Sequence, residues 1–152
     1  MKKKTQKIIR TEEHHRRPVS LGGSENDPSN VAFVLPVPHR SWHVLFGNMN
    51  AEQICNRINS SPWKPEGITI ICKFINGQEI KARGGKNSKN EKKCQEAWNL
   101  LFRNISFQEI VNYINSVWLD PSYHFYTKKW NPPVDDRNSH RQVGFSYFIY
   151  MH

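Results

Sequence analysis

Two histidines that stand four residues apart are the first side chains in this chain whose type and spacing indicate chemistry. His39 and His43 fall in a segment that we expect to form a helix from Pro38 to about Phe46. Side chains four apart on a helix project from one face, with Cβ atoms about 5–6 Å apart. Two imidazoles at that spacing can share one metal ion. Such a pair alone is more often two surface or interface histidines, so a metal site requires further ligands.

A second pair of histidines, His14 and His15, closes the first predicted strand. Successive strand residues point to opposite faces, so one ring can bind a metal while the other faces a different target. Asn30 stands at the start of the second predicted strand, after a glycine-containing loop. Its amide both donates and accepts hydrogen bonds, so it can fix the loop backbone. The alternative for Asn30 is an ordinary turn residue.

Taken together, these residues resemble the HNH, or ββα-metal, endonucleases. The similarity is carried by the run HHRRPVSLGG, then Asn30, then the pair His39 and His43. Fourteen residues separate His15 from Asn30 and eight separate Asn30 from His39, as the family pattern expects. Over residues 10–47 the chain is most similar to the nuclease domains of colicin-type bacteriocins. The matching residues are Glu12, His14, His15, Pro18, Ser20, Gly22 and Gly23.

The resemblance implies an α+β fold, with a ββα-metal finger over residues 8–47, and a metal-dependent endonuclease that hydrolyses phosphodiester bonds. In that family pattern, His15 would be the general base, a task that suits a neutral imidazole. Asn30 would support the loop that aims His15. One divalent metal ion (Zn, Mg, Mn or Ni) would complete the site. Its ligands would be His14, His39 and His43.

The charge of the chain favours a polyanionic partner. Lysine and arginine number 22 against 13 acidic residues, a net charge of +9 over 152 residues. Phosphate contacts by such side chains release counterions, so nucleic acid is the expected partner, with DNA favoured over RNA. A basic, well-solvated surface is the plain alternative. Arg10, Arg16 and Arg17 could bind a phosphate in a bidentate manner or form such a solvated face.

Other features of the composition exclude several classes of protein. The three cysteines, Cys55, Cys72 and Cys94, include no CxxC pair, so they predict neither a disulfide framework nor a zinc knuckle. Free buried thiols in a reducing cytosol explain them most simply, so we expect a cytoplasmic protein. No run approaches 18 apolar residues, so we expect no membrane partner.

The rest of the chain contains an internal repeat. Residues 42–60 align with residues 98–116 without gaps, with nine identities over nineteen positions, where random pairing gives roughly one. We interpret this as a duplicated helix–helix–strand unit. Asn76-Gly77 predicts a hairpin turn, with residues 78–82 as its return strand. The predicted organisation is a basic arm (1–7), the finger (8–47), a first unit (42–82), a second unit (94–130) without histidines at the two helix positions, and a loop with a terminal strand (131–152).

The two copies differ at the positions that could do chemistry. His39 and His43 in the first copy correspond to Gln95 and Asn99 in the second. Because the second copy packs without histidines, packing does not explain them, which indicates a special task for the first copy. Two other functions stay open: a non-catalytic nucleic-acid or ribonucleoprotein-binding protein that retains an HNH scaffold, and a zinc-stabilised structural protein. The last gives His15 no task.

Overall fold

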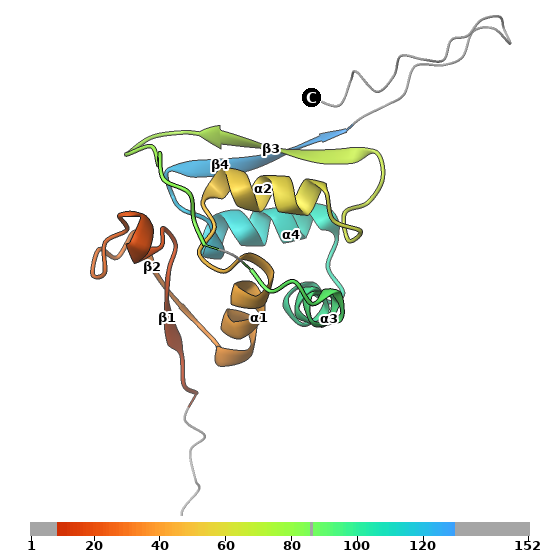
Figure 1. The fold of residues 1–152 in the computed structure, drawn as a ribbon, viewed down its shortest axis with the longest axis horizontal. Helices are drawn as coiled ribbons and strands as arrows, with labels where there is room; N and C mark the ends of the chain where they lie inside the picture. The colour runs from red at the N-terminus through yellow and green to blue at the C-terminus, as the bar shows by residue number, and fades with distance from the viewer. Residues whose placement is uncertain (1–8, 86, 130–152) are drawn as a thin grey trace, which may run out of the picture.

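The computed structural model describes residues 9–85 and 87–129, which fold into four α-helices and two small antiparallel sheets (Figure 1). The fold is therefore mixed α+β, as predicted. The predicted basic arm at 1–7 and the predicted C-terminal loop and strand at 131–152 both lie outside the described residues. Within the described ranges, no helix is long and apolar enough to cross a membrane.

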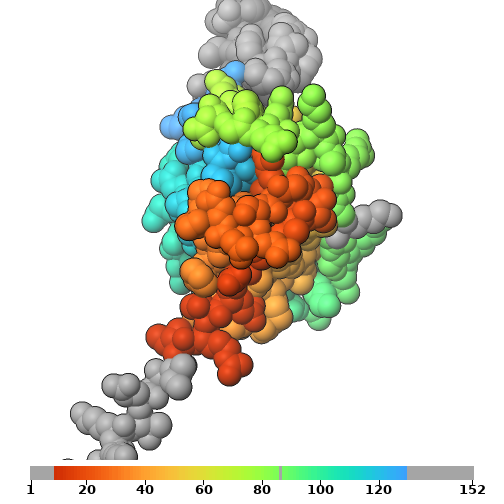
Figure 2. All heavy atoms as spheres, turned by 90° about the vertical axis from the view of Figure 1, so that its left-hand side faces the viewer, coloured from red at the N-terminus to blue at the C-terminus, as the bar shows by residue number. Residues whose placement is uncertain are grey.

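The N-terminal part of the described chain is a two-stranded hairpin that leads directly into a helix. The hairpin strands are antiparallel, with His14 opposite Ala32, and a short 3-10 turn lies in the loop that joins them. Figure 2 shows this hairpin and its loop on one side of the molecule. The elements are β1 (Glu12–His15), η1 (Val19–Leu21), β2 (Val31–Val34) and α1 (Pro36–Phe46).

The ends of α1 follow from local sequence. The helix begins at Pro36, two residues before the predicted start. Proline is well tolerated at the first helical position, because the N–H that it lacks would have no partner within the helix there. It ends at Phe46 and is followed by Gly47, whose φ of 54 and ψ of −128 favour glycine. The helix keeps His39 and His43 on the turns that face β1.

Together with α1, the remaining elements form two helix–helix–strand series, in the order that the repeat predicts. The second series differs from the prediction in one respect: its second α-helix is short and continues as a π-helical turn. The elements are α2 (Ala51–Asn59), β3 (Ile68–Phe74), α3 (Glu91–Phe102), α4 (Phe107–Tyr113), the π-helical η2 (Ile114–Trp118) and β4 (Tyr123–Lys129).

Equivalent residues of the two copies make equivalent contacts. Asn50 and Ser106, which stand at matching positions, each form a capping box at the start of α2 and α4. Asn59 bonds both the N–H and the carbonyl of Ile70 in β3. Asn115 does the same with Phe125 in β4. The sequence repeat is therefore also a repeat of local structure.

The tryptophans link the two copies reciprocally. Trp42 of α1 stacks on Trp118, which follows α4, with ring centroids 5.1 Å apart. Trp98 of α3 stacks on Trp63, which follows α2, at 5.0 Å. Trp42 and Trp98 are both buried, at 2% and 7% exposure, as predicted. Each copy thus completes the core of the other.

The predicted hairpin at Asn76-Gly77 is wrong in its second strand. The chain does turn there, but residues 78–82 form no strand, and β3 pairs along its whole length with β4. Two long-range contacts divert the segment: Arg17 donates to the carbonyl of Gln78, and the N–H of Ile80 donates to the hydroxyl of Tyr123. The matching strand of the second copy outcompetes the local return strand.

The three cysteines are free, as predicted. Cys55 and Cys94 are buried, whereas Cys72 is partly exposed. Burial raises the pKa of the Cys55 thiol to about 11 and that of Cys72 to about 12. Both stay protonated thiols at neutral pH, which suits packing and not reactivity.

Candidate metal centre

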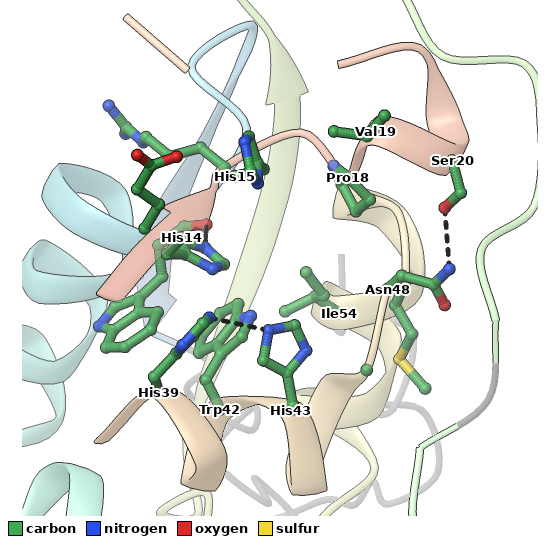
Figure 3. A pocket seen from close by; sticks show the side chains of 15 residues that line it. His14, His15, Pro18, Val19, Ser20, His39, Trp42, His43, Asn48 and Ile54 are labelled. Atoms are coloured by element: carbon green, nitrogen blue, oxygen red, sulfur yellow. Dashed lines mark hydrogen bonds between the residues drawn. The ribbon is translucent and has the colours of Figure 1, made fainter. Parts of the chain in front are cut away.

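Three histidines from two elements converge beside α1. His14 comes from β1, and His39 and His43 come from successive turns of α1. One ring nitrogen from each lies within 4.8 Å of the others, and Figure 3 shows the three rings turned toward a common point. Metal–nitrogen bonds near 2 Å require nitrogens this close. The predicted convergence is confirmed, and the three side chains form a group that could hold a metal ion.

His14 presents one nitrogen to this point without any other partner. Its Nε2 lies 2.9 Å from the carbonyl oxygen of Trp118. Because a carbonyl only accepts, Nε2 carries the proton and Nδ1 carries the lone pair. Nδ1 is buried and has no hydrogen-bond partner among the described residues, in a side chain only 3% exposed. A buried acceptor without a partner is costly. A cation at the centre of the three rings would satisfy it.

His39 is oriented from behind by a carboxylate. Its Nδ1 lies 2.8 Å from Oε1 of Glu12, so Nδ1 donates and Nε2 is left as the ligand atom. That Nε2 is 3.1 Å from Nε2 of His43. A carboxylate that holds the far nitrogen of a histidine is a common arrangement behind metal ligands, because it fixes ring orientation and raises basicity. Glu12, Nδ1 of His14 and the donor set therefore fit a divalent metal.

Burial keeps two of the three rings, those of His14 and His43, neutral. The pKa of His14 is lowered to about 3, chiefly by burial. The hydrogen bond to Trp118 opposes this shift, and the nearby His43, His39 and Arg16 add to it. The pKa of His43 is also lowered, first by burial and then by His39. Neutral imidazoles are the form that binds metals, so both rings are ready to act as ligands at neutral pH.

His15 is held apart from the other three histidines. Its Nε2 lies 3.2 Å from the carbonyl of Glu25, in the loop between the hairpin strands, so Nε2 donates and Nδ1 is the basic nitrogen. The ring is partly exposed and lines the same pocket as the metal group (Figure 3). His14 and His15 therefore face different targets, as strand alternation predicts.

Asn30 ties together the two sides of the loop that holds His15. Its Oδ1 accepts from the N–H of Arg17 at 2.7 Å, and its Nδ2 donates to the carbonyls of Arg17 and Ser24. The adjacent Gly23 is required by this packing, because a Cβ there would lie 1.9 Å from the Arg17 carbonyl oxygen. These are the contacts expected of an amide that fixes loop backbone.

The four histidines line an open pocket of about 300 Å³. The hairpin forms one wall, and the segment after α1 forms the other. Asn48 joins the two walls by donating to the hydroxyl of Ser20 at 2.9 Å (Figure 3).

Two of the three arginines proposed to contact nucleic acid fasten the hairpin to the second copy. Arg17 is 8% exposed, and its Nε donates to the carboxylate of Asp120 at 2.7 Å. Arg16 donates to the carbonyls of Leu119 and Asn115 at 2.8 and 2.6 Å. We therefore withdraw Arg17 as a phosphate ligand, because its charge is neutralised in the interior. Arg16 lines the pocket, and Arg10 is exposed.

The residues that sequence reasoning missed are in the second copy. Trp118 supplies the carbonyl that sets the His14 tautomer, and Asp120 anchors the hairpin through Arg17. The repeated tryptophan was a signal for Trp118 as a core residue, but no local motif marks Asp120.

Comparisons of the chain with protein-family models, with curated proteins and with solved structures found no match.

Proposed function

We propose that the chain is an HNH-type endonuclease that hydrolyses phosphodiester bonds of nucleic acid, with one divalent metal ion and a histidine general base. The observation that carries the proposal is the division of labour among four histidines in one pocket. Three converge with a buried, unpartnered Nδ1 on His14, while His15 is held by a backbone carbonyl beside them. The strand–strand–helix order of β1, β2 and α1 supports identifying this region as a ββα-metal finger.

In the proposed reaction, His15 moves the proton. Its Nδ1 accepts a proton from the attacking water as the water oxygen bonds to phosphorus, while its Nε2–H stays on the Glu25 carbonyl. The bond from phosphorus to one bridging oxygen then breaks, and that oxygen keeps the electron pair. A divalent ion held by His14, His39 and His43 would supply Lewis-acid stabilisation of the charge on the phosphate and leaving oxygens.

The other residues hold this geometry. His14, His39 and His43 would bind the ion, Glu12 orients His39, and Asn30 keeps the loop carbonyl of Glu25 in place for His15. The metal and the general base would thus be positioned by separate sets of contacts. That separation makes the two roles distinguishable by mutation.

The test is cleavage of plasmid DNA and of RNA with Mg²⁺, Mn²⁺, Ni²⁺ and Zn²⁺ in turn, with His15→Ala as the paired variant. We expect His15→Ala to lose about 10²–10⁴ in rate while isothermal titration with the same metal ion still detects binding. Cleavage by His15→Ala at the wild-type rate would overturn the catalytic assignment. A non-catalytic nucleic-acid-binding protein would then be the better hypothesis.

A further inference from the structure

Three of the four side chains in the run 14–17 bind oxygen atoms of residues 115–120 in the second unit. The exception is His15, the proposed general base, whose Nε2 donates to the carbonyl of Glu25 in the hairpin loop at 3.2 Å. That carbonyl sets the direction in which the ring presents Nδ1. A displacement of the loop would therefore displace the proton acceptor of the proposed reaction.

Asn30 connects this loop to the backbone of Arg17. Its Nδ2 donates to the carbonyl of Ser24, the residue before Glu25, at 2.9 Å. Its Oδ1 accepts the N–H of Arg17 at 2.7 Å, and its Nδ2 also donates to the Arg17 carbonyl at 3.0 Å. Asn30 is 6% exposed, and hydrogen bonds shielded from water are electrostatically stronger. A shift of the Arg17 backbone is therefore transmitted through one side chain to the Glu25 carbonyl.

The side chain of Arg17 is fixed in turn by the second unit. Its Nε donates to Oδ2 of Asp120 at 2.7 Å, with the two side chains only 9% and 4% exposed. Another nitrogen of the guanidinium donates to the carbonyl of Gln78. Asp120 is itself held, because its Oδ1 accepts the N–H of Ser122 at 2.9 Å. The pair cannot separate without leaving a buried charge unpaired, which is strongly unfavourable.

The burial of the Arg17–Asp120 pair indicates a role other than stability, because lost hydration offsets most of the attraction between two buried charges. An apolar pair of similar volume often stabilises a fold as well or better. An ion pair does fix the direction of both partners, since the hydrogen bond weakens steeply when it bends. General-base catalysis needs such accuracy, because the base must come within about 2.6–3.2 Å of the atom that gives up the proton.

We propose that Asp120 is a positioning residue for the general base: through Arg17 and Asn30, it holds the Glu25 carbonyl that orients His15. Asp120 is not among the residues that line the pocket, so its effect on the reaction passes through His15. The inference rests on the proposed function, because it takes His15 as the general base. It also makes the second unit part of the nuclease, since the finger does not supply this anchor.

The test is a double-mutant cycle between Asp120→Asn and His15→Ala. Plasmid cleavage is measured with whichever of Mg²⁺, Mn²⁺, Ni²⁺ and Zn²⁺ the wild type uses fastest. We expect Asp120→Asn to lower kcat at least about tenfold and to change KM by less than about twofold, because misplacement by 1 Å can cost about 10²-fold in rate. In the His15→Ala background the same change should lower kcat by less than about twofold, since the group that Asp120 positions is gone.

Two further variants separate positioning from loss of stability. Trp98→Ala is the matched control, because it removes a core ring of the second unit that packs on Trp63 and Phe102. It should destabilise the chain while the folded protein keeps the wild-type kcat. Arg17→Lys keeps a positive charge beside Asp120, so it leaves no buried carboxylate unpaired and should fold even where Asp120→Asn does not. It should also lower kcat, because an ammonium group does not reproduce the planar fork of arginine.

Three outcomes would overturn the inference while the wild type cleaves. One is wild-type kcat in Arg17→Lys and in any folded Asp120→Asn protein. Another is an equal loss from Asp120→Asn with and without His15, which would show an effect that does not pass through the base. The third is an equal loss of kcat in Trp98→Ala, which would show that instability alone slows cleavage.

Hydrogen exchange in EDTA separates this inference from the proposed function, because it requires no cleavage. The N–H of Arg17 is bonded to the Asn30 side chain, so Asp120→Asn or Arg17→Lys should speed its exchange relative to the amides of α2. A wild-type chain that never cleaves would refute the endonuclease. An unchanged exchange rate of the Arg17 amide would refute the link from Asp120 to the loop, whether or not the chain cleaves.

Discussion

The two helix–helix–strand units have the same scaffold but different surfaces on their first helices. In α1, His39 and His43 face the hairpin, with their Nε2 atoms 3.1 Å apart. In α3, the equivalent Gln95 and Asn99 are exposed, and Gln95 donates to Asn99 at 3.2 Å. Both pairs are in contact, but only the first is covered by a strand that brings a third histidine.

The histidine at position 39, where the second unit has glutamine, lowers the stability of the fold. In the second unit, the side-chain oxygen of Gln95 accepts the indole N–H of Trp63 at 3.0 Å. In the first unit, His39 stands at the position of Gln95, and Trp118 corresponds to Trp63. The indole N–H of Trp118 is buried without a partner among the described residues. A buried donor without an acceptor destabilises the fold. Such a local loss is expected where residues are selected for a function.

The largest expected difference between the two units comes from mutating equivalent positions, His43→Ala in α1 and Asn99→Ala in α3. We expect His43→Ala to lose cleavage by at least about 10²-fold, by analogy with the loss of a catalytic group. Its melting temperature should no longer rise with added metal, because only a bound ligand stabilises the folded state. Asn99→Ala should keep both properties. Similar behaviour of the two variants in cleavage assays and melts would refute the assignment of function to the first unit alone.

The core tryptophans test whether the units are equivalent in packing. Trp42→Ala and Trp98→Ala should each lower the free energy of unfolding by about 3–5 kcal/mol, as large core deletions do. Only Trp42 contacts the metal group, with its ring centroid 6.0 Å from that of His14. Urea unfolding measures the stability, and titration calorimetry on folded protein measures the metal. Weakened metal binding in Trp98→Ala would show that the units are not separable.

Acid should destabilise the metal-free protein through His14, in the hairpin that covers the first unit. Its folded pKa of about 3 is below the ordinary histidine value of 6.5, so the unfolded chain takes up a proton first as the pH falls. Stability is therefore fully present above pH 6.5 and declines between pH 6.5 and 3. From pH 7 to pH 5 the loss should be about 2 kcal/mol. Urea unfolding in EDTA at both pH values measures it, and His14→Gln should remove most of the difference.

The sequence predicted most of the site because the site is made of local patterns. The i, i+4 spacing of His39 and His43 and the alternation of His14 and His15 follow directly from helix and strand geometry. It did not predict which strand pairs with β3, because the turn at Asn76-Gly77 satisfies a local rule that a long-range partner overrides. Nor could it assign Arg17 to Asp120, since the two are 103 residues apart and meet only in the folded chain.

The smallest expected effect is the change in stability caused by His39→Gln, which tests directly whether the histidine lowers stability. His39→Gln gives the first unit the residue that the second unit has at this position. The glutamine oxygen can then accept the indole N–H of Trp118, as Gln95 does for Trp63, so the metal-free variant should gain about 1 kcal/mol of stability. The lost contact between His39 and Glu12 is partly exposed and should offset little of this gain. Urea unfolding in EDTA gives the comparison, with Gln95→His as the reverse change, which should cost a similar amount.

The same His39→Gln variant should lose its stabilisation by metal. A variant that is less stable than the wild type in EDTA would show that His39 is retained for packing, and the contrast between the two units would lose its functional meaning.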